Sequence, residues 1–213
     1  MNKKVVIIGA GGHAAAIFDI LQCLNVTVTA LISPEKSLRF CFKGMQCWDD
    51  NYFVKNCHPK EYSLINGIGS IPGVNLRKNI YEKYRELGFD FISVVSPHAI
   101  VSPYAFIEDG AQILHNVIIQ NGALIKSNAI INTGSIIEHD CIIGAHSHIA
   151  PGVVLSGSTI LDDGVHIGTG ACIIQGIKVG KNAILGAGAV LTKDLPANSI
   201  SYPPRGIIAE RKG

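Results

Sequence analysis

The sequence predicts two parts: a small α/β domain with a parallel sheet, then a left-handed parallel β-helix built from hexapeptide repeats. Three observations carry this prediction. Apolar runs alternate with apolar residues at helical spacing in the first half. A six-residue repeat runs through the second half without a break. Hydrophobic residues make up 47% of the 213 residues and charged residues only 16%, so apolar side chains must be spread through a regular core.

The first half alternates strand-like and helix-like segments. Four apolar runs are typical of buried parallel strands: residues 5–8, 26–32, 62–65 and 91–95. Apolar residues at helical spacing over 14–21 predict one helix, and a second is expected over 74–87, ending at Gly88. Residues 33–61 show no strong period. This order predicts a doubly wound, Rossmann-like domain, which we place at residues 1–96.

The second half repeats every six residues. Three hexapeptides form one triangular coil of roughly 18 residues in this class of β-helix, and stacked coils stabilise one another. A β-sandwich would instead require alternation with a period of two. We place the β-helix at residues 97–196 and a C-terminal tail at 197–213. The sixteen residues of the repeat are all aliphatic: Val101, Ile107, Ile113, Ile119, Ile125, Ile131, Ile137, Ile143, Ile149, Leu155, Leu161, Ile167, Ile173, Val179, Leu185 and Leu191.

Composition limits the classes of function. The net charge of +2 gives no electrostatic argument for nucleic acid or an anionic membrane surface. No run approaches the roughly 18 apolar residues that a membrane helix needs. The mean hydropathy of +0.31 therefore predicts a partner subunit that covers part of the apolar surface. The N-terminus shows no signal-peptide pattern, and the six cysteines form no CxxC pair, so we expect reduced thiols in a cytoplasmic protein.

The strongest local feature is His139. Ile137 and Cys141 take the two inward positions of their hexapeptide, so His139 should project outward from a corner. An imidazole suits general-base catalysis, and a neighbouring carboxylate such as Asp140 can fix its tautomer. A solvated surface histidine beside two acids would show the same pattern. The residues alone favour neither interpretation.

A second group of histidines raises the question of a metal. His146 and His148 form an H-x-H pair, and His166 follows His148 by 18 residues, so those two should stack on one face. Neutral imidazoles can bind zinc, and some proteins with this β-helix are zinc-dependent carbonic anhydrases. That alternative leaves the first domain unexplained. We therefore expect no metal.

The turn after the first strand is rich in glycine. Gly9, Gly11 and Gly12 precede His13, a pattern that suits a phosphate at a helix N-terminus. A tight turn without a ligand would look similar. Binding of NAD also needs an acid at the end of the second strand, where Ser33 and Pro34 stand instead. Binding of the diphosphate of another nucleotide at this turn stays an open alternative.

Together these motifs resemble a family, the bacterial nucleotide-sugar N-acetyltransferases. It is typified by the enzyme that acetylates the 4-amino sugar in bacillosamine synthesis, and the sialic acid O-acetyltransferases are relatives. The similarity covers nearly the whole chain. Its landmarks are Gly9-Ala10-Gly11-Gly12-His13, Gly67-Ile68-Gly69 with Arg77, Tyr81 and Gly88-Phe89, and Ile137-Glu138-His139-Asp140 with His148.

The resemblance implies acetyl-CoA-dependent acetylation of the amine of a UDP- or dTDP-linked 4-amino-4,6-dideoxy sugar, by direct attack. It implies that His139 is the general base and that Asp140 orients it. Family members that bind uridine often carry acidic residues after the second strand. Ser33-Pro34 stands there in this sequence, which leaves dTDP as an alternative to UDP. The residues implied to bind the nucleotide sugar are Gly9, Gly11, Gly12, His13, Gly67, Gly69 and Asn132.

The same resemblance implies a homotrimer with coenzyme A running along the β-helix between subunits. Two other functions stay open: an O-acetyltransferase acting on a sialic acid or another sugar, and a non-enzymatic β-helix scaffold. The residues implied to contact acetyl-CoA are His148, Thr169, Gly170, Gly186, Ala187 and Gly188.

Overall fold

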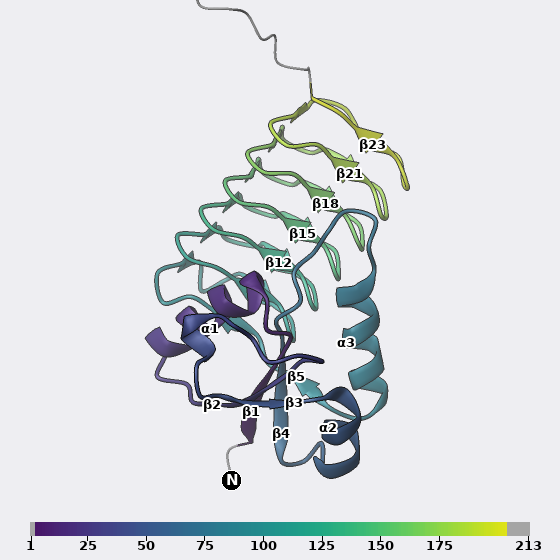
Figure 1. The fold of residues 1–213 in the computed structure, drawn as a ribbon. Helices are drawn as coiled ribbons and strands as arrows, with labels where there is room; N and C mark the ends of the chain where they lie inside the picture. Colours follow the sequence, from purple (N-terminus) through teal and green to yellow (C-terminus); the bar gives the residue numbers. More distant parts are fainter. Residues whose placement is uncertain (1–2, 204–213) are drawn as a thin grey trace, which may run out of the picture.

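The computed structural model describes residues 3–203, which form a five-stranded parallel sheet with helices and then a parallel β-helix (Figure 1). The strand order of the first sheet is β3-β2-β1-β4-β5. Its elements along the chain are β1 (Lys4–Ile8), α1 (Gly12–Cys23), β2 (Val28–Ile32), the 3-10 helix η1 (Phe40–Phe42), β3 (Gln46–Trp48), α2 (Asp50–Asn56), β4 (Tyr62–Asn66), α3 (Leu76–Glu86) and β5 (Asp90–Phe91).

The predicted strands over 5–8, 26–32 and 62–65 and both predicted helices are present, with small shifts at their ends. The expectation of a single strand over 91–95 is wrong. Phe91 ends β5 in the first sheet, whereas Val94 begins β6 (Val94–Val95), which pairs with the β-helix. The chain passes from one sheet to the other within two residues, and an apolar run alone carries no sign of this change.

Residues 33–61 contain η1, β3 and α2, none of which the sequence pattern predicted. These elements are too short for a period to stand out. The helix α2 has only seven residues, and the side chain of Asp49 caps it by accepting a hydrogen bond of 2.8 Å from the Tyr52 N–H. Phe53 of α2 packs against Trp48 and Tyr62 and closes one side of the sheet.

The β-helix has three parallel sheets of two-residue strands, which the chain visits in turn. Sheet I contains β6, β9 (Gln112–Ile113), β12 (Ile130–Ile131), β15 (His148–Ile149), β18 (His166–Ile167), β21 (Ile184–Leu185) and β23 (Ile200–Ser201). Sheet II contains β7 (Ile100–Val101), β10 (Ile118–Ile119), β13 (Ile136–Ile137), β16 (Val154–Leu155), β19 (Cys172–Ile173) and β22 (Val190–Leu191). Sheet III contains β8 (Phe106–Ile107), β11 (Leu124–Ile125), β14 (Ile142–Ile143), β17 (Ile160–Leu161) and β20 (Lys178–Val179).

The predicted repeat matches the register of the coils. Ile137 pairs with Ile119 in the coil before and with Leu155 in the coil after, each 18 residues away. All three side chains are buried in one continuous core, together with mostly small residues that face inward four positions later in the repeat. The expected β-helix is therefore present, and β23 extends it to Ser201 inside the segment predicted as a tail.

Every sixth residue from Gly110 to Gly188 has a left-handed backbone, with φ between +56° and +73°. Glycine meets this requirement without strain, which explains why it recurs in the sequence. Asparagine and aspartate tolerate the conformation because their short polar side chains can bond locally. Asp140 and His146 occupy two of these positions, with φ of +60° and +61°.

The first domain packs against the beginning of sheet I. Ile7, Ile17 and Leu31 share a buried cluster with Val94 and Ile130, whose side chains point outward from sheet I. This contact brings the β1–α1 turn to the outer face of sheet I. Within the described residues, no helix is both long and apolar enough to cross a membrane.

Candidate active site

The turn between β13 and β14 carries a histidine–aspartate pair at the corner of sheets II and III. Nδ1 of His139 lies 2.8 Å from Oδ2 of Asp140, and the two side chains are 53% and 66% exposed. The side chain of His139 thus projects outward, as the register predicts, and Cys141 faces the core. Because the carboxylate can only accept, neutral His139 carries its proton on Nδ1 and presents a lone pair at Nε2.

Two glycines make room for this pair. A Cβ atom on Gly157, one coil after His139, would lie 2.6 Å from both Cε1 and Nε2 of the imidazole. A Cβ atom on Gly122, one coil before Asp140, would lie 2.5 Å from its Oδ1. The repeat does not reveal these roles, because glycine recurs throughout the β-helix and Gly122 also occupies one of the left-handed positions described above.

His148 lies on the outer face of sheet I. Oδ1 of Asn132 accepts a hydrogen bond of 2.8 Å from the Thr133 N–H, so the Asn132 amide directs Nδ2 at Nε2 of His148, 3.3 Å away. Neutral His148 then carries its proton on Nδ1, a buried atom with no hydrogen-bond partner within the described residues. Burial, helped by His166 and His13, lowers the pKa of His148 to about 3. His148 is therefore a neutral donor that lacks an acceptor.

His166 stacks beside His148, as the sequence predicts. Their ring centroids are 4.8 Å apart in an edge-to-face arrangement, and Nδ1 of His166 is also buried without a partner within residues 3–203. In that part of the chain, no three or more His, Cys, Asp or Glu side chains are grouped so that they could hold a metal ion.

His13 reaches the same face from the glycine turn. It lies in the first turn of α1, whose N-terminal cap is Gly11, and its Nε2 is 2.7 Å from Oε1 of Gln112 on β9. Burial and the nearby charge of Arg77 lower the pKa of His13 to about 4. The residue is therefore neutral near pH 7.

The turn that contains Gly9 packs closely against the turn that contains Gly67. A Cβ atom on Gly67 would lie 2.7 Å from the Ile8 carbonyl oxygen, and one on Gly9 would lie 2.7 Å from the Ile68 side chain. One on Gly69 would make an ordinary contact of 3.5 Å with Cβ of His13. Gly9 and Gly67 thus have a packing role in the fold. Gly11 has open space beside it, which leaves its backbone accessible.

The residues expected to contact coenzyme A line one edge. Thr169 and Gly170 lie one coil below Ala187 and Gly188 at the corner of sheets I and II, and the Gly188 N–H bonds the Thr169 carbonyl at 2.8 Å. These four residues are exposed, and Gly186 is half-buried. Asn132 lies at the same corner two coils earlier, beside His148.

The structure thus brings most predicted site residues to sheet I and its corner with sheet II. His139 and Asp140 are the exception. They lie at the corner of sheets II and III, which is opposite sheet I across the core of the triangular coil. Within one chain the dyad therefore cannot contact His13 or His148.

A hollow beside the glycine turn contains residues that the sequence pattern did not single out. It is lined by Ala10, Gly11, Ser33, Glu35, Lys36, Ser37, Leu38 and Arg39. The Ser37 hydroxyl donates to the Ala10 carbonyl at 3.0 Å, and Arg39 lies beside Gly12. The segment after β2 therefore brings two cations, and the acid Glu35, to the N-terminus of α1.

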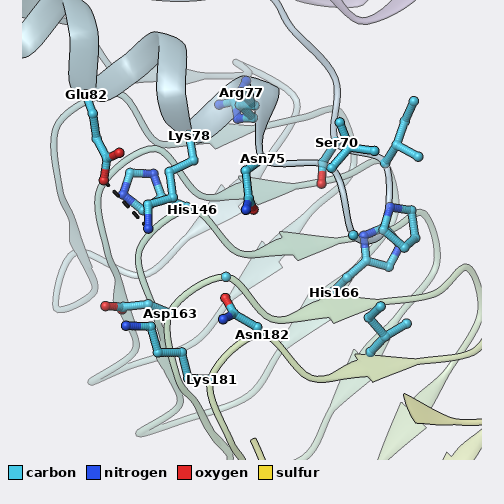
Figure 2. A pocket seen from close by; sticks show the side chains of 16 residues that line it. Ser70, Asn75, Arg77, Lys78, Glu82, His146, Asp163, His166, Lys181 and Asn182 are labelled. Atoms are coloured by element: carbon cyan, nitrogen blue, oxygen red, sulfur yellow. Dashed lines mark ion pairs between the residues drawn. The ribbon is translucent and has the colours of Figure 1, made fainter. Parts of the chain in front are cut away.

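A separate polar pocket of about 370 Å³ lies at the corner of sheets I and III, under the segment that leads into α3 (Figure 2). Lys78 pairs with Glu82 at 3.7 Å, and Nδ1 of His146 lies 2.9 Å from Nδ2 of Asn128. The His146 ring also lies edge-to-face with that of Tyr81 in α3, with centroids 5.5 Å apart, so His146 belongs to the contact between the domains. The pocket contains none of the residues predicted to bind substrate or acetyl-CoA.

The buried histidines predict that acid destabilises the protein. The pKa values of His13 and His148 fall from 6.5 in the unfolded chain to about 4 and about 3 when folded. The unfolded chain therefore binds more protons below pH 6.5, and stability falls as pH falls, by about 1.4 kcal/mol per pH unit for each histidine. Urea unfolding at pH 7 and pH 5 measures this loss. His148→Gln should reduce it, and an unchanged loss in that variant contradicts the assignment.

Comparison with known proteins identifies both parts. Residues 4–84 match the family model of the PglD N-terminal domain, and residues 123–157 match the bacterial transferase hexapeptide (six repeats) model. PerB from Caulobacter crescentus, solved in complex with CoA and GDP-perosamine, is 31% identical with a TM-score of 0.84, and the match covers 100% of this chain and 99% of that chain. The acetyltransferase domain of PglB from Neisseria gonorrhoeae, solved in complex with acetyl coenzyme A, is 28% identical with a TM-score of 0.86 over 97% of this chain and 100% of that one.

A glycine turn facing a hexapeptide β-helix with an exposed histidine–aspartate pair defines a hexapeptide acyltransferase, and the left-handed β-helix expected from the repeat is confirmed. The chain belongs to the family of nucleotide-sugar N-acetyltransferases that join a PglD-type N-terminal domain to this β-helix. WeeI from Acinetobacter baumannii, 22% identical with a TM-score of 0.78 over 93% of this chain and 96% of that chain, shares the fold.

Proposed function

We propose that this protein transfers the acetyl group of acetyl-CoA to the amine of a nucleotide-linked 4-amino-4,6-dideoxy sugar. The observation that carries the proposal is full-length similarity to an enzyme solved with CoA and GDP-perosamine, joined to an exposed His139–Asp140 pair on the β-helix. One histidine of that enzyme has been replaced by Asn and by Ala in structures that still hold CoA and GDP-perosamine. GDP therefore joins UDP and dTDP as a candidate nucleotide.

The glycine turn and the hollow beside it are the proposed site for the nucleotide diphosphate. The open backbone at Gly11 and the N-terminus of α1 favour phosphate oxygens, and Arg39 and Lys36 add positive charge. Glu35 lines the same hollow, three residues after β2. An acid is thus present near the end of the second strand, where Ser33-Pro34 had suggested none.

The proposed step is direct attack of the sugar amine on the thioester carbonyl. A C–N bond forms and the C–S bond breaks, while Nε2 of His139 takes the amine proton and returns it to the leaving thiolate. Asp140 holds the Nδ1 proton and stabilises the imidazolium. The unpartnered Nδ1–H of His148 is available to an oxygen of the thioester or the tetrahedral intermediate.

Because one chain keeps the dyad away from sheet I, the proposal needs a second copy that brings its His139 to the sheet I face of its neighbour. Apolar side chains point outward on both sheets that flank the dyad. Ile100 and Val190 of sheet II are 68% and 64% exposed, and Phe106 of sheet III is 68% exposed. A homotrimer buries these side chains and completes three equal sites.

Activity assays and sedimentation test this function together. Purified protein with acetyl-CoA is offered GDP-perosamine, UDP- and dTDP-linked 4-amino-4,6-dideoxy sugars, and CMP-sialic acid. We expect release of CoA with one of the amino sugars, an N-acetyl product by mass spectrometry, and a species of three chains in sedimentation. Acetylation of a hydroxyl, or no thermal shift with acetyl-CoA, contradicts the proposal in favour of an O-acetyltransferase or a scaffold.

Asp140→Asn is expected to lower kcat at least 10-fold, toward the roughly 10⁴-fold loss that an asparagine in place of an orienting aspartate can cause. Asparagine tolerates the left-handed backbone, but its amide can donate to Nδ1 of His139. The imidazole proton then moves to Nε2, and the base loses its lone pair. Asp109→Asn, at an exposed turn with no side-chain hydrogen bond within the described residues, is the matched control and should keep wild-type kcat. Equal kcat in both variants contradicts this role.

A further inference from the structure

A chain of buried polar groups connects the first domain to the β-helix and ends at His13. Nε2 of Gln112 donates to the Asn66 carbonyl at 2.8 Å, and Oε1 of Gln112 lies 2.7 Å from Nε2 of His13. Gln112 is fully buried and Asn66 is 1% exposed. A side-chain amide in a sheet that otherwise presents apolar or histidine side chains to the first domain requires an explanation.

The Asn66 carbonyl is held in place from the other side. Nη1 of Arg77 donates to it at 2.7 Å and to the Ile68 carbonyl at the same distance, and Nε of Arg77 donates to the Asn128 carbonyl at 3.3 Å. Nδ2 of Asn66 in turn donates to the Arg77 carbonyl at 2.9 Å. Arg77 is 4% exposed, so this arrangement is locked within the contact between the two domains.

These contacts determine the orientation of the Gln112 amide. A backbone carbonyl can only accept, so the nitrogen of Gln112 must face Asn66 and its oxygen must face His13. The oxygen can only accept as well, so Nε2 of His13 must donate. We propose that Gln112 is a positioning residue that fixes the proton of His13 on Nε2 and leaves Nδ1 as a hydrogen-bond acceptor for the bound nucleotide sugar.

Burial and Arg77 favour a neutral imidazole at His13, so that ring carries a single proton. Nδ1 of His13 has no hydrogen-bond partner within residues 3–203 and is not among the buried unpartnered atoms of that part of the chain. Its lone pair is therefore open to a ligand. The opposite tautomer at His148, set by Asn132, gives the same face one acceptor and one donor.

The position of the proton on His13 determines which part of the ligand can bind at Nδ1. This step rests on the proposed function. Diphosphate oxygens only accept hydrogen bonds, so they are excluded from Nδ1 and belong with the backbone N–H groups of the glycine turn. A sugar hydroxyl or amine N–H can donate to it. Neutral His13 therefore accepts a hydrogen bond from the sugar part of the ligand and not from the diphosphate.

Long-range 1H–15N spectra of the protein labelled with [15N]histidine test the tautomer without any substrate, with His13→Asn used to assign the signals. At pH 7.5 wild-type His13 should show a protonated Nε2 and an unprotonated Nδ1. Gln112→Glu keeps the acceptor but adds a charge, so both nitrogens of His13 should become protonated. Protonation of Nδ1 in the wild type, or a neutral His13 in Gln112→Glu, overturns the proposal.

Kinetics with GDP-perosamine and acetyl-CoA add a readout that loss of structure would not give. Gln112→Glu should raise the KM for the sugar nucleotide at least 10-fold and leave the KM for acetyl-CoA unchanged, because a charged His13 donates where it should accept. Gln120→Glu, an exposed change of the same kind, should match the wild type. An unchanged sugar KM in Gln112→Glu overturns the ligand role. Absence of turnover with every sugar contradicts the proposed function, while the spectra still decide the tautomer.

Discussion

His139→Ala is expected to lower kcat by about 10²- to 10⁴-fold, the usual contribution of a general base. The side chain is half-exposed at a corner, makes no core contact and bonds only Asp140 within the described residues. Its removal should therefore leave the fold and the binding of both substrates intact. Steady-state kinetics with acetyl-CoA and the amino-sugar nucleotide measure the loss as a fall in kcat with little change in either KM.

Two further measurements separate this loss from damage to the protein. The thermal shift with acetyl-CoA should stay at its wild-type value, because His139 is proposed to act on the sugar amine and is not among the residues expected to hold the coenzyme. His58→Ala, an exposed histidine in the first domain, should turn over like the wild type. Near-wild-type kcat in His139→Ala would remove the dyad from the reaction and return His139 to an ordinary surface residue.

The β-helix could be predicted almost completely from the sequence because its period is set by geometry that every coil repeats. Each aliphatic residue of the repeat must stack on the one 18 residues away, as Ile137 does on Ile119 and Leu155, so a single misfit would be visible. The same register placed His139 at an outer corner and Cys141 in the core. It also placed His148 and His166 on one face, where their rings meet.

The first domain was harder to predict from the sequence, because several of its elements are short and depend on tertiary contacts. The strand β3 and the helix α2 are ordered by Trp48, Phe53 and Tyr62, which lie far enough apart in the chain that no local period connects them. For the same reason Glu35 and Arg39 were not recognised as neighbours of the glycine turn. Their approach to α1 depends on the path of the whole segment after β2.

The role of Gln112 could not be predicted from the sequence for a different reason. A glutamine in a two-residue strand gives no sign of being buried, and its partners Asn66 and His13 are 46 and 99 residues away. The sequence could place Asn132 and His148 near the site through family resemblance. It could not show that a side-chain amide sets the tautomer of each histidine, because that follows only from which neighbouring atoms can donate.

Gly157→Ala is expected to lower kcat by about 10- to 100-fold, because the new methyl group displaces the imidazole of His139, which we propose as the general base. Its Cβ would lie 2.6 Å from Cε1 and Nε2 of His139, closer than side chains can approach. Gly157 is not among the residues with a left-handed backbone, so alanine adds no backbone strain there. The effect should therefore come from the ring alone, as lower kcat with an unchanged KM for acetyl-CoA.

A double-mutant cycle on stability gives the sharper test, since it asks whether the methyl group and the imidazole compete for one space. Gly157→Ala should cost about 0.5–1.5 kcal/mol of unfolding free energy in the wild type, the usual cost of forcing a side chain off its rotamer, because the imidazole it strikes is half-exposed and can turn. In the His139→Ala background the same change should cost little, because the atoms it strikes are gone. An equal cost in both backgrounds would mean that alanine disturbs the coil itself. In that case the glycine serves the backbone and has no part in placing the base.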